Sequence, residues 1–426
     1  MAASHGWSLE GVEVFELVTE EGLSPDSEQS ILHPSEVELG ETTRGVIAAV
    51  ERIKPERVVF DSLSEMRLLA QNPLRYRRQV LALKTFFAAR HCTVLMLDDR
   101  SAEKDDLQLH SIAHGVISLE QTVGHYGPER RSLRVVKMRG IPFRGGLHDF
   151  NLDTGGLSVF PRLVAAEHRS DFDAEVVSTG NAGLDQLLGG GLVRGSNMLF
   201  MGPSGVGKTT TALACALEAL KRGEKAAYYL FDEGLGTLLA RSKALGMDVS
   251  PYLDDGLLQI RTLDPAEVSP GEFANLVRKA VEDMGAGTVV IDSLNAYMQA
   301  MSGGKHLMLQ MHELLTYLSQ RGIVTILVMA QHGVVGEVRS DVDLSYLSDG
   351  NLLFRYFEAR GSLLKAISVI KSRTSEHEQS IREFRLGPGG IEVGNALENF
   401  HGVMSGIASY EGKTPLLSDG DLLGQP

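Results

Sequence analysis

Cysteine, tryptophan and long apolar runs are all scarce in this chain. Its 426 residues include two cysteines, Cys92 and Cys215, and one tryptophan. Two thiols beside apolar residues support neither a disulfide framework nor a zinc site, and they favour a reducing cytoplasm. The start, MAASHGWSLEGVEVFEL, has no basic region followed by an apolar stretch, as a secretory signal would. We therefore expect a cytoplasmic globular protein without a transmembrane segment.

Basic residues are also in deficit. The chain has 41 Lys and Arg against 55 Asp and Glu, a formal charge of −14. Sequence-independent nucleic-acid binding depends on Lys and Arg that neutralise phosphates, so the total charge argues against nucleic acid as a partner, although a local basic strip remains open. The length and the 43% hydrophobic content allow two or three domains with full cores.

What the chain does contain is a phosphate-binding loop. The stretch GPSGVGKT, residues 202–209, fits the pattern G-x-x-x-x-G-K-[ST], with an apolar run before it and a helical pattern after it. In such a loop, backbone N–H groups face phosphate oxygens, Lys208 contacts the β- and γ-phosphates, and the Thr209 hydroxyl binds Mg²⁺. We expect ATP to be bound by Gly202, Pro203, Ser204, Gly205, Val206, Gly207, Lys208, Thr209 and Thr210.

Carboxylates follow two other apolar runs. Asp292 closes TVVID and is predicted to hold Mg²⁺ together with Thr209. The next residue is Ser293 rather than Glu, so a general base has to come from elsewhere. Asp232 and Glu233 end the run YYLF, where a carboxylate can lie beside the γ-phosphate and polarise water. The alternative is a solvated acidic pair at a strand end.

The sequence contains an internal repeat. RVVFDSLSEM around Asp61 recurs as TVVIDSLNAY around Asp292, 231 residues later, and PSEVELGE recurs as PAEVSPGE with the same offset. Further on, RVVKMRG around Lys137 matches SVIKSRT around Lys371 at an offset of 234. Such self-similarity indicates one fold that is present twice.

The repeat also predicts an incomplete first copy. The equivalent of Gly202 falls upstream of Met1, so we expect the first domain to lack a phosphate loop. Either a segment is missing from the start, or the front domain has lost nucleotide binding. We favour a missing segment, because a sheet without its central strand has unpaired edges. The expected organisation is a truncated first domain at 1–160, a linker at 161–176, a complete second domain at 177–394 and a tail at 395–426.

The two copies are predicted to have an α/β fold. Apolar runs alternate with helical patterns: VVF, TVLML, GVISL and LRVVKM in the first copy, and NMLFM, AAYYLF, TVVID, VTILVMA and AISVIK in the second. This alternation indicates largely parallel sheets with helices on both faces. Ligands then bind at the carboxyl ends of the strands, where the phosphate loop, Asp232 and Asp292 all fall.

Together with GNAGLDQLLGGGLVRG ahead of the loop, these motifs resemble the KaiC family of RecA-like ATPases. The resemblance extends from about residue 6 to 406 and implies two tandem RecA-like P-loop domains, the first without its loop, in a hexameric ring. The family usually has Glu-Glu-Ser after the strand that matches YYLF, with the first Glu as base; here the same positions are Asp232, Glu233 and Gly234. The family's K-x-R motif matches Lys371 and Arg373, which in the family reach the γ-phosphate of a neighbouring subunit; solvated cations on an edge strand are the alternative.

Two further positions follow from the same resemblance. Gln331, after VTILVMA, falls where RecA-like proteins keep a polar residue that senses the γ-phosphate, although a solvent-facing Gln is an equal alternative. The clock member of the family phosphorylates its own adjacent Ser and Thr in a segment that aligns with SDVDLSYLSDG. Ser345 matches the serine, Tyr346 replaces the threonine, and Ser340 matches a further family threonine. Autophosphorylation at Ser345 is thus a hypothesis, but we do not extend the family member's role in a circadian clock to this chain.

Three functions remain in competition at this point. The leading hypothesis is a Mg²⁺-dependent KaiC-type ATPase with one site, in the second domain, with Ser/Thr autokinase activity as an additional possibility and an unidentified signalling protein as partner. The second is a RecA-like or RadA-like DNA-dependent ATPase in repair. The third is a non-catalytic, nucleotide-gated binding module in which Asp232 holds ATP without splitting it.

Overall fold

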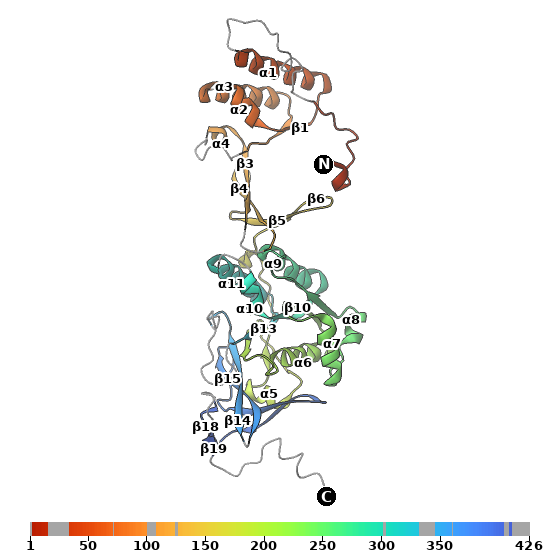
Figure 1. Ribbon diagram of the computed structural model, residues 1–426, viewed down its shortest axis with the longest axis vertical. Coiled ribbons are helices and arrows are strands. Elements are labelled where there is room, and N and C mark those ends of the chain that lie inside the picture. Colours follow the sequence, from red (N-terminus) through yellow and green to blue (C-terminus); the bar gives the residue numbers. More distant parts are fainter. Residues whose placement is uncertain are drawn as a thin grey trace. The chain divides into compact units, whose positions relative to one another are not determined.

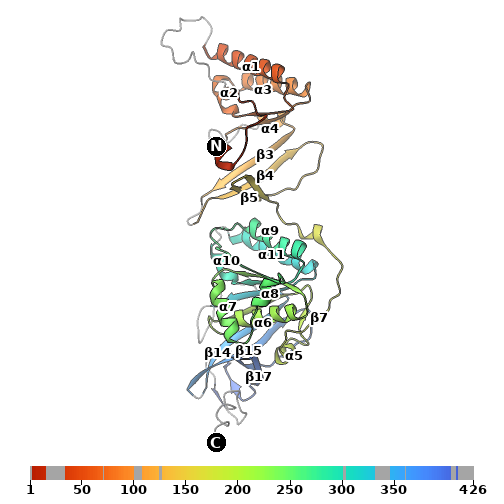
Figure 2. The same ribbon diagram turned by 90° about the vertical axis from the view of Figure 1, so that its right-hand side faces the viewer.

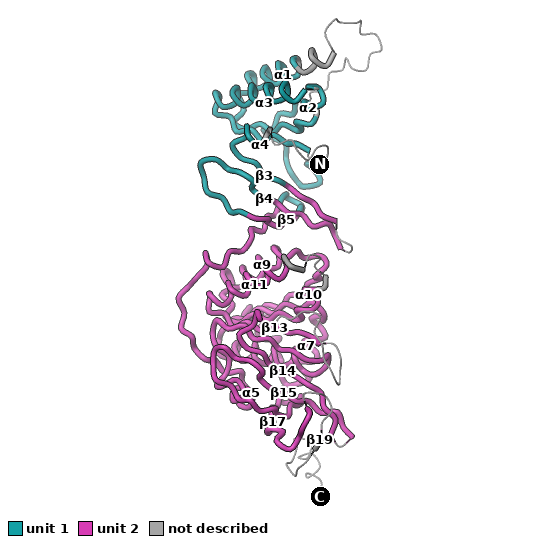
Figure 3. The backbone as a smooth tube through the Cα atoms, turned by 90° about the vertical axis from the view of Figure 1, so that its left-hand side faces the viewer, with its two compact units in different colours: residues 1–118, 134–145, 152–157 teal, residues 119–133, 146–151, 158–426 magenta. Residues whose placement is uncertain are grey.

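The computed structural model describes residues 2–15, 34–70, 72–99, 108–123, 127–300, 304–331, 346–359, 361–403 and 409–410. Contacts within the chain divide it into two compact units, shown in different colours in Figure 3. Unit 1 comprises residues 1–118, 134–145 and 152–157, and unit 2 comprises 119–133, 146–151 and 158–426. No helix of the described part is long and apolar enough to cross a bilayer.

Unit 2 is built on a nine-stranded sheet with the order β11-β10-β12-β13-β9-β14-β15-β16-β17. The pairs from β11 to β14 are parallel, and those from β14 to β17 are antiparallel. The strands are β9 (Asn197–Gly202), β10 (Lys225–Leu230), β11 (Leu258–Thr262), β12 (Ala286–Asp292), β13 (Val324–Ala330), β14 (Gly350–Ala359), β15 (Ser362–Ser372), β16 (Arg382–Gly387) and β17 (Gly390–Ala396).

The predicted apolar runs of the second copy all form strands. β9 is buried at every one of its six positions, as expected of a central parallel strand that is covered on both faces. The runs that became β10, β12, β13 and β15 are confirmed in the same way. The α/β fold class is therefore confirmed, and the antiparallel extension β15 to β17 adds to it an edge made of hairpins.

Helices cover both faces of this sheet, as Figures 1 and 2 show. One core cluster packs α6 against even-numbered positions of β9 such as Met198 and Phe200, and the other packs α9 and α11 against odd-numbered positions such as Leu199 and Met201. The helices of unit 2 are α5 (Ala182–Leu187), α6 (Lys208–Lys221), α7 (Leu235–Ala244), α8 (Ser250–Asp254), α9 (Pro270–Lys279), α10 (Leu294–Ala300) and α11 (Gly304–Gln320).

Short elements complete this unit. The segment before α5 turns through Asn181, whose side chain accepts a hydrogen bond from the N–H of Leu184 at 3.0 Å and so caps the helix. The short elements are η3 (Ala165–His168), the π-helical turn η4 (Ala280–Met284), the pair β7 (Val176–Val177) and β8 (Leu192–Val193), and the pair β18 (Phe400–His401) and β19 (Ser409–Tyr410).

Unit 1 has its own small core around a parallel pair of strands. β1 (Arg57–Phe60) pairs with β2 (Thr93–Met96) in the register Val59 to Leu95. Phe60 and neighbouring helical residues form a separate hydrophobic cluster. The helices are η1 (Ala2–His5), α1 (Pro34–Ile53), α2 (Leu63–Ala70), α3 (Pro73–Ala88) and α4 (Gln108–Ile112).

A second sheet follows, with the order β3-β4-β5-β6. Its strands are β3 (Gly115–Thr122), β4 (Arg130–Met138), β5 (His148–Asp153) and β6 (Gly156–Phe160). In unit 2, β9 lies between β13 and β14, whereas β1 and β2 of the front copy form a two-stranded sheet. Among the described residues, the front copy thus has no counterpart of the strand that leads into the phosphate loop.

Candidate functional site

The predicted phosphate loop connects the end of β9 to the start of α6. Gly202, the last residue of β9, has a φ of 156°, and a Cβ there would lie 2.4 Å from the Phe354 carbonyl oxygen. Gly207, the N-cap of α6, has a φ of 121°, and a Cβ there would lie 2.7 Å from the Phe384 ring. A side chain would be strained at both places, so glycine is required for the loop to lie this close to Phe354 of β14 and Phe384 of β16.

Not all side chains of the loop face a ligand. Val206 is fully buried in the hydrophobic core and Thr210 is buried in the first turn of α6. These two residues can therefore contribute backbone N–H groups to a phosphate, whereas their side chains stabilise the loop. Ser204 and Gly205 are exposed, and Thr209 is half-buried beside them. The helix N-terminus at this point favours an anion.

Lys208 is the buried cation of the loop. Its Nζ donates to the carbonyl oxygens of Gly202 at 2.9 Å and Pro203 at 2.7 Å. Burial lowers the pKa of Lys208 to about 8 and outweighs the negative charge of Asp292, which by itself raises the pKa. The ammonium group is thus held inside the curve of the loop, where an anionic ligand would raise its pKa again.

Asp292 lies at the end of β12, close to Lys208 and Thr209. Its carboxylate is 7% exposed, and burial raises its pKa although hydrogen bonds from Thr209 and Tyr228 and the charge of Lys208 lower it. The Tyr228 hydroxyl donates to Asp292 Oδ2 at 2.9 Å. Burial and this carboxylate raise the pKa of Tyr228 well above its usual value, so the phenol remains a donor.

These oxygen atoms fit a magnesium ion. A hydroxyl and a carboxylate are ligands that Mg²⁺ prefers, and with few protein ligands it uses water and substrate phosphates for the rest. Thr209 and Asp292 supply those two ligand types at one place. No group of three or more His, Cys, Asp or Glu able to hold a metal occurs among the described residues.

The acidic pair after β10 divides into two different groups. Asp232 is exposed, and its Oδ2 accepts a hydrogen bond from the Ser293 hydroxyl. Glu233 instead accepts two hydrogen bonds from Arg241, at 2.7 and 2.8 Å. Because the guanidinium neutralises Glu233, Asp232 is the carboxylate of the pair that remains accessible to a water molecule or substrate.

Gln331 follows β13, directly beside the start of the loop. Its N–H donates to the Gly202 carbonyl oxygen at 2.9 Å, and its Oε1 is buried without a hydrogen-bond partner in the described structure. Asn295 of α10 fixes the preceding residue: its amide accepts from the Ala330 N–H at 2.7 Å and donates to the Ala330 carbonyl at 3.0 Å. The end of β13 is thus held in place for Gln331.

Lys371 and Arg373 lie at the other edge of the sheet. Lys371 pairs with Asn351, and Asn351 pairs with Leu199, three residues or about 10 Å before the loop begins at Gly202. We call this side of the sheet, where β9 and β14 begin, the amino edge. The structure therefore brings together the loop, Asp292, Asp232 and Gln331, but it does not bring these two cations to the same place.

Contacts at the amino edge involve the residues just before β14. Lys371 Nζ donates to the Ser348 carbonyl at 2.6 Å, and the Arg373 N–H donates to the Asp349 carbonyl at 2.8 Å. Tyr346 begins this stretch and is 55% exposed. Ser345 and Ser340 lie outside the described residues, so the structure does not place the predicted phosphorylation site.

Four residues of this site were not among the predicted ones. Tyr228 and Ser293 hold the two carboxylates, Arg241 neutralises Glu233, and Asn295 holds the end of β13. Ser293 stands in the DSL stretch that both copies share, which was a usable signal, whereas the first copy has Ser64 in place of Asn295. Tyr228 reads as a core strand residue and Arg241 as a helix surface residue, so their sequence context gave no indication of these contacts.

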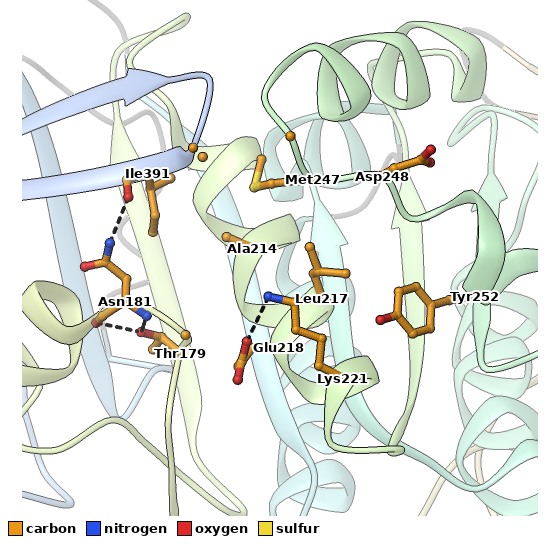
Figure 4. Close-up of a pocket in the computed structure, with 14 residues that line it drawn as sticks. Thr179, Asn181, Ala214, Leu217, Glu218, Lys221, Met247, Asp248, Tyr252 and Ile391 are labelled. Atoms are coloured by element: carbon orange, nitrogen blue, oxygen red, sulfur yellow. Dashed lines mark hydrogen bonds and ion pairs between the residues drawn. The ribbon is translucent and has the colours of Figure 1, made fainter.

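A separate hollow of about 340 Å³ lies at the far end of α6 (Figure 4). It is lined by residues such as Asn181, Glu218 and Tyr252. Glu218 is ten residues after Lys208 along the helix, a rise of about 15 Å, so this hollow is distinct from the phosphate loop. An ion pair joins Lys221 to Glu218 at 3.3 Å on the helix surface.

The chain is similar to known proteins of one family. The protein-family model described as ATPase: KaiC matches residues 1–164 and 177–398. The circadian clock oscillator protein KaiC of Parasynechococcus marenigrum is 25% identical over 416 residues, which cover 95% of this chain and 80% of that protein. KaiC of Synechococcus elongatus is 25% identical over 416 residues, covering 95% and 78%. The circadian clock protein KaiC3 of a Synechocystis strain is 23% identical, covering 95% and 80%.

Proposed function

The chain belongs to the KaiC ATPase family, and on this basis we propose that it is a Mg²⁺-dependent ATPase with its catalytic site in the second domain, residues 177–394. The observation that carries the proposal is the convergence of Lys208, Thr209 and Asp292 at the start of α6. A phosphate-binding loop, an ammonium group and two magnesium ligands at one point match the requirements of triphosphate binding.

The proposed role of each residue follows from its surroundings. Backbone N–H groups of residues 202–210 and the Lys208 ammonium hold the phosphates, and Gln331 contacts the γ-phosphate from the end of β13. Bound Mg²⁺ would neutralise charge that develops on the phosphates, and Thr209 and Asp292 would hold it.

Asp232 accepts a proton from the attacking water as the oxygen of that water bonds to the γ-phosphorus and the bond to the β-phosphate breaks. The Ser293 hydroxyl supports this role because it orients the Asp232 carboxylate. Glu233 is the less suitable base, since its carboxylate is paired with Arg241. We therefore propose that the ion pair between Glu233 and Arg241 holds the segment between β10 and α7 in place.

We further propose that the catalytic site is completed by a second copy of the chain in a ring, which we take to be a hexamer. Lys371 lies about 10 Å from its own loop along the sheet and Arg373 follows two residues later, which supports a role for these cations at a neighbour's γ-phosphate. A head-to-tail ring puts the amino edge of one copy against the loop of the next.

Autophosphorylation of Ser345 is the finer part of the proposal. Tyr346, the residue after Ser345, is 55% exposed, and it stands two residues before Ser348, whose carbonyl oxygen accepts a hydrogen bond from Lys371. The Ser345 hydroxyl would replace water as the attacking group and leave phosphoserine and ADP. A signalling protein that reads the state of the ring would be the partner, in the cytoplasm.

The test is turnover of ATP by the purified chain, with Lys208→Ala as the matched control. We expect Mg²⁺-dependent release of phosphate by the wild type and at least a hundredfold less by the variant. Equal turnover by both would refute the site. Tight ATP binding without turnover would favour a nucleotide-gated module, and stimulation by single-stranded DNA would favour a repair ATPase. Mass spectrometry after incubation with Mg²⁺ and ATP would show whether Ser345 carries phosphate.

A further inference from the structure

Tyr228 connects three elements of the site. It lies on β10 between β11 and β12 and is completely buried. Its hydroxyl is 2.9 Å from Asp292 Oδ2, at the end of β12, and 3.5 Å from the carbonyl oxygen of Thr209, in the first turn of α6. The same strand leads directly to Asp232. A single phenol therefore joins the strand of the base, the strand of the magnesium carboxylate and the helix of the loop.

The contact with Asp292 restricts the carboxylate. A buried carboxylate needs hydrogen-bond donors, and Asp292 receives them from Tyr228 on one side and from Thr209 on the other. Without the phenol, Oδ2 would lose its buried donor and the carboxylate could rotate about its χ2 torsion. With the phenol in place, the carboxylate is held in one orientation next to Thr209, the other proposed ligand.

We propose that Tyr228 is the positioning residue for the divalent cation of this site: its hydroxyl holds the Asp292 carboxylate so that Asp292 and Thr209 face the same metal. This inference rests on the proposed ATPase function and adds to it a residue that touches neither nucleotide nor metal. Partners that orient a metal ligand through a hydrogen bond typically contribute ten- to a hundredfold to metal affinity.

The neighbouring residue in the strand provides a matched control. Tyr229 is also completely buried, but it points to the opposite face, where its hydroxyl donates to the Leu276 carbonyl at 3.2 Å. Tyr229→Phe removes a buried phenolic hydroxyl from the same strand without touching Asp292. Any effect of simple loss of packing or of a buried hydrogen bond should appear in both variants.

The experiment measures binding rather than turnover. Fluorescently labelled ATP is titrated onto wild type, Tyr228→Phe and Tyr229→Phe in EDTA, and Mg²⁺ is then added at fixed nucleotide. We expect equal binding of the three proteins in EDTA. The Mg²⁺ concentration that half-saturates the metal-dependent change should rise about tenfold for Tyr228→Phe and remain unchanged for Tyr229→Phe.

Other outcomes decide against the inference. An unchanged Mg²⁺ midpoint for a folded Tyr228→Phe, or the same shift in both variants, would overturn it while leaving the ATPase proposal intact. Failure of the wild type to bind ATP at all would refute the proposed function, and this inference with it. If Tyr228→Phe does not fold, Tyr228→Met, which also lacks the hydroxyl but adapts to irregular space, replaces it in the same comparison.

Discussion

The buried ammonium of Lys208 predicts that nucleotide affinity depends on pH in the alkaline range. Its pKa in the free protein is about 8, below the 10.5 of an exposed lysine. The folded protein therefore binds fewer protons than the unfolded chain between about pH 8 and 10.5, and the contribution of Lys208 to stability rises with pH there. Phosphate oxygens raise this pKa again, so binding takes up a proton wherever the free Lys208 is neutral.

The magnitude follows from the fraction of Lys208 that is protonated. With a pKa of about 8, roughly three quarters of the free side chains are charged at pH 7.5 and only about 3% at pH 9.5. The affinity for ATP should therefore fall about 25-fold between these two pH values. The γ-phosphate of ATP is already largely ionised at pH 7.5, so ATP itself contributes little to the change.

The assay is fluorescence anisotropy of labelled ATP in EDTA, so that no metal ligand takes part in the titration. Lys208→Arg is the control, because its guanidinium remains charged at pH 9.5. This variant should bind more weakly at pH 7.5 but show little further decline. A wild-type affinity that stays constant from pH 7.5 to 9.5 would refute the reasoning that Lys208 is both desolvated and in contact with the phosphates.

Three more predictions concern the backbone of the phosphate loop, the proposed general base Asp232 and the neighbouring subunit of the proposed ring. Gly202→Ala places a Cβ 2.4 Å from the Phe354 carbonyl oxygen and should lower the free energy of unfolding by about 2 kcal/mol, measured by denaturant titration. The control is Gly234→Ala, where the Cβ meets open space and the free energy of unfolding should change by less than about 0.5 kcal/mol. Ser293→Ala frees Asp232 and should lower kcat about tenfold while binding of ATP in EDTA is unchanged; a lower affinity with normal kcat would contradict this. Finally, the inactive variants Lys208→Ala and Lys371→Ala are mixed in equal amounts. The mixture should recover about a quarter of wild-type turnover if each loop uses the lysine of a neighbouring chain, whereas no recovery would count against the ring.

The sequence alone was sufficient for the fold class, the internal repeat and the position of the loop. Each depends on local pattern: β9 is a continuous apolar run because a central parallel strand is buried on both faces, and the glycines of the loop reflect the close approach of β14. Asp292 could be found because a carboxylate after an apolar strand lies at the carboxyl end of the sheet, where ligands bind.

Only the tertiary structure decided which side chains meet. Three contacts depend on strand order and side-chain direction, which sequence spacing does not encode. They are the hydrogen bonds from Tyr228 to Asp292 and from Ser293 to Asp232, and the ion pair by which Arg241 neutralises Glu233. The structure also showed that Lys371 lies at the amino edge, away from its own loop, because β15 runs antiparallel to β14. The reason is physical: a local pattern determines which elements form, whereas contacts between distant segments depend on how those elements pack.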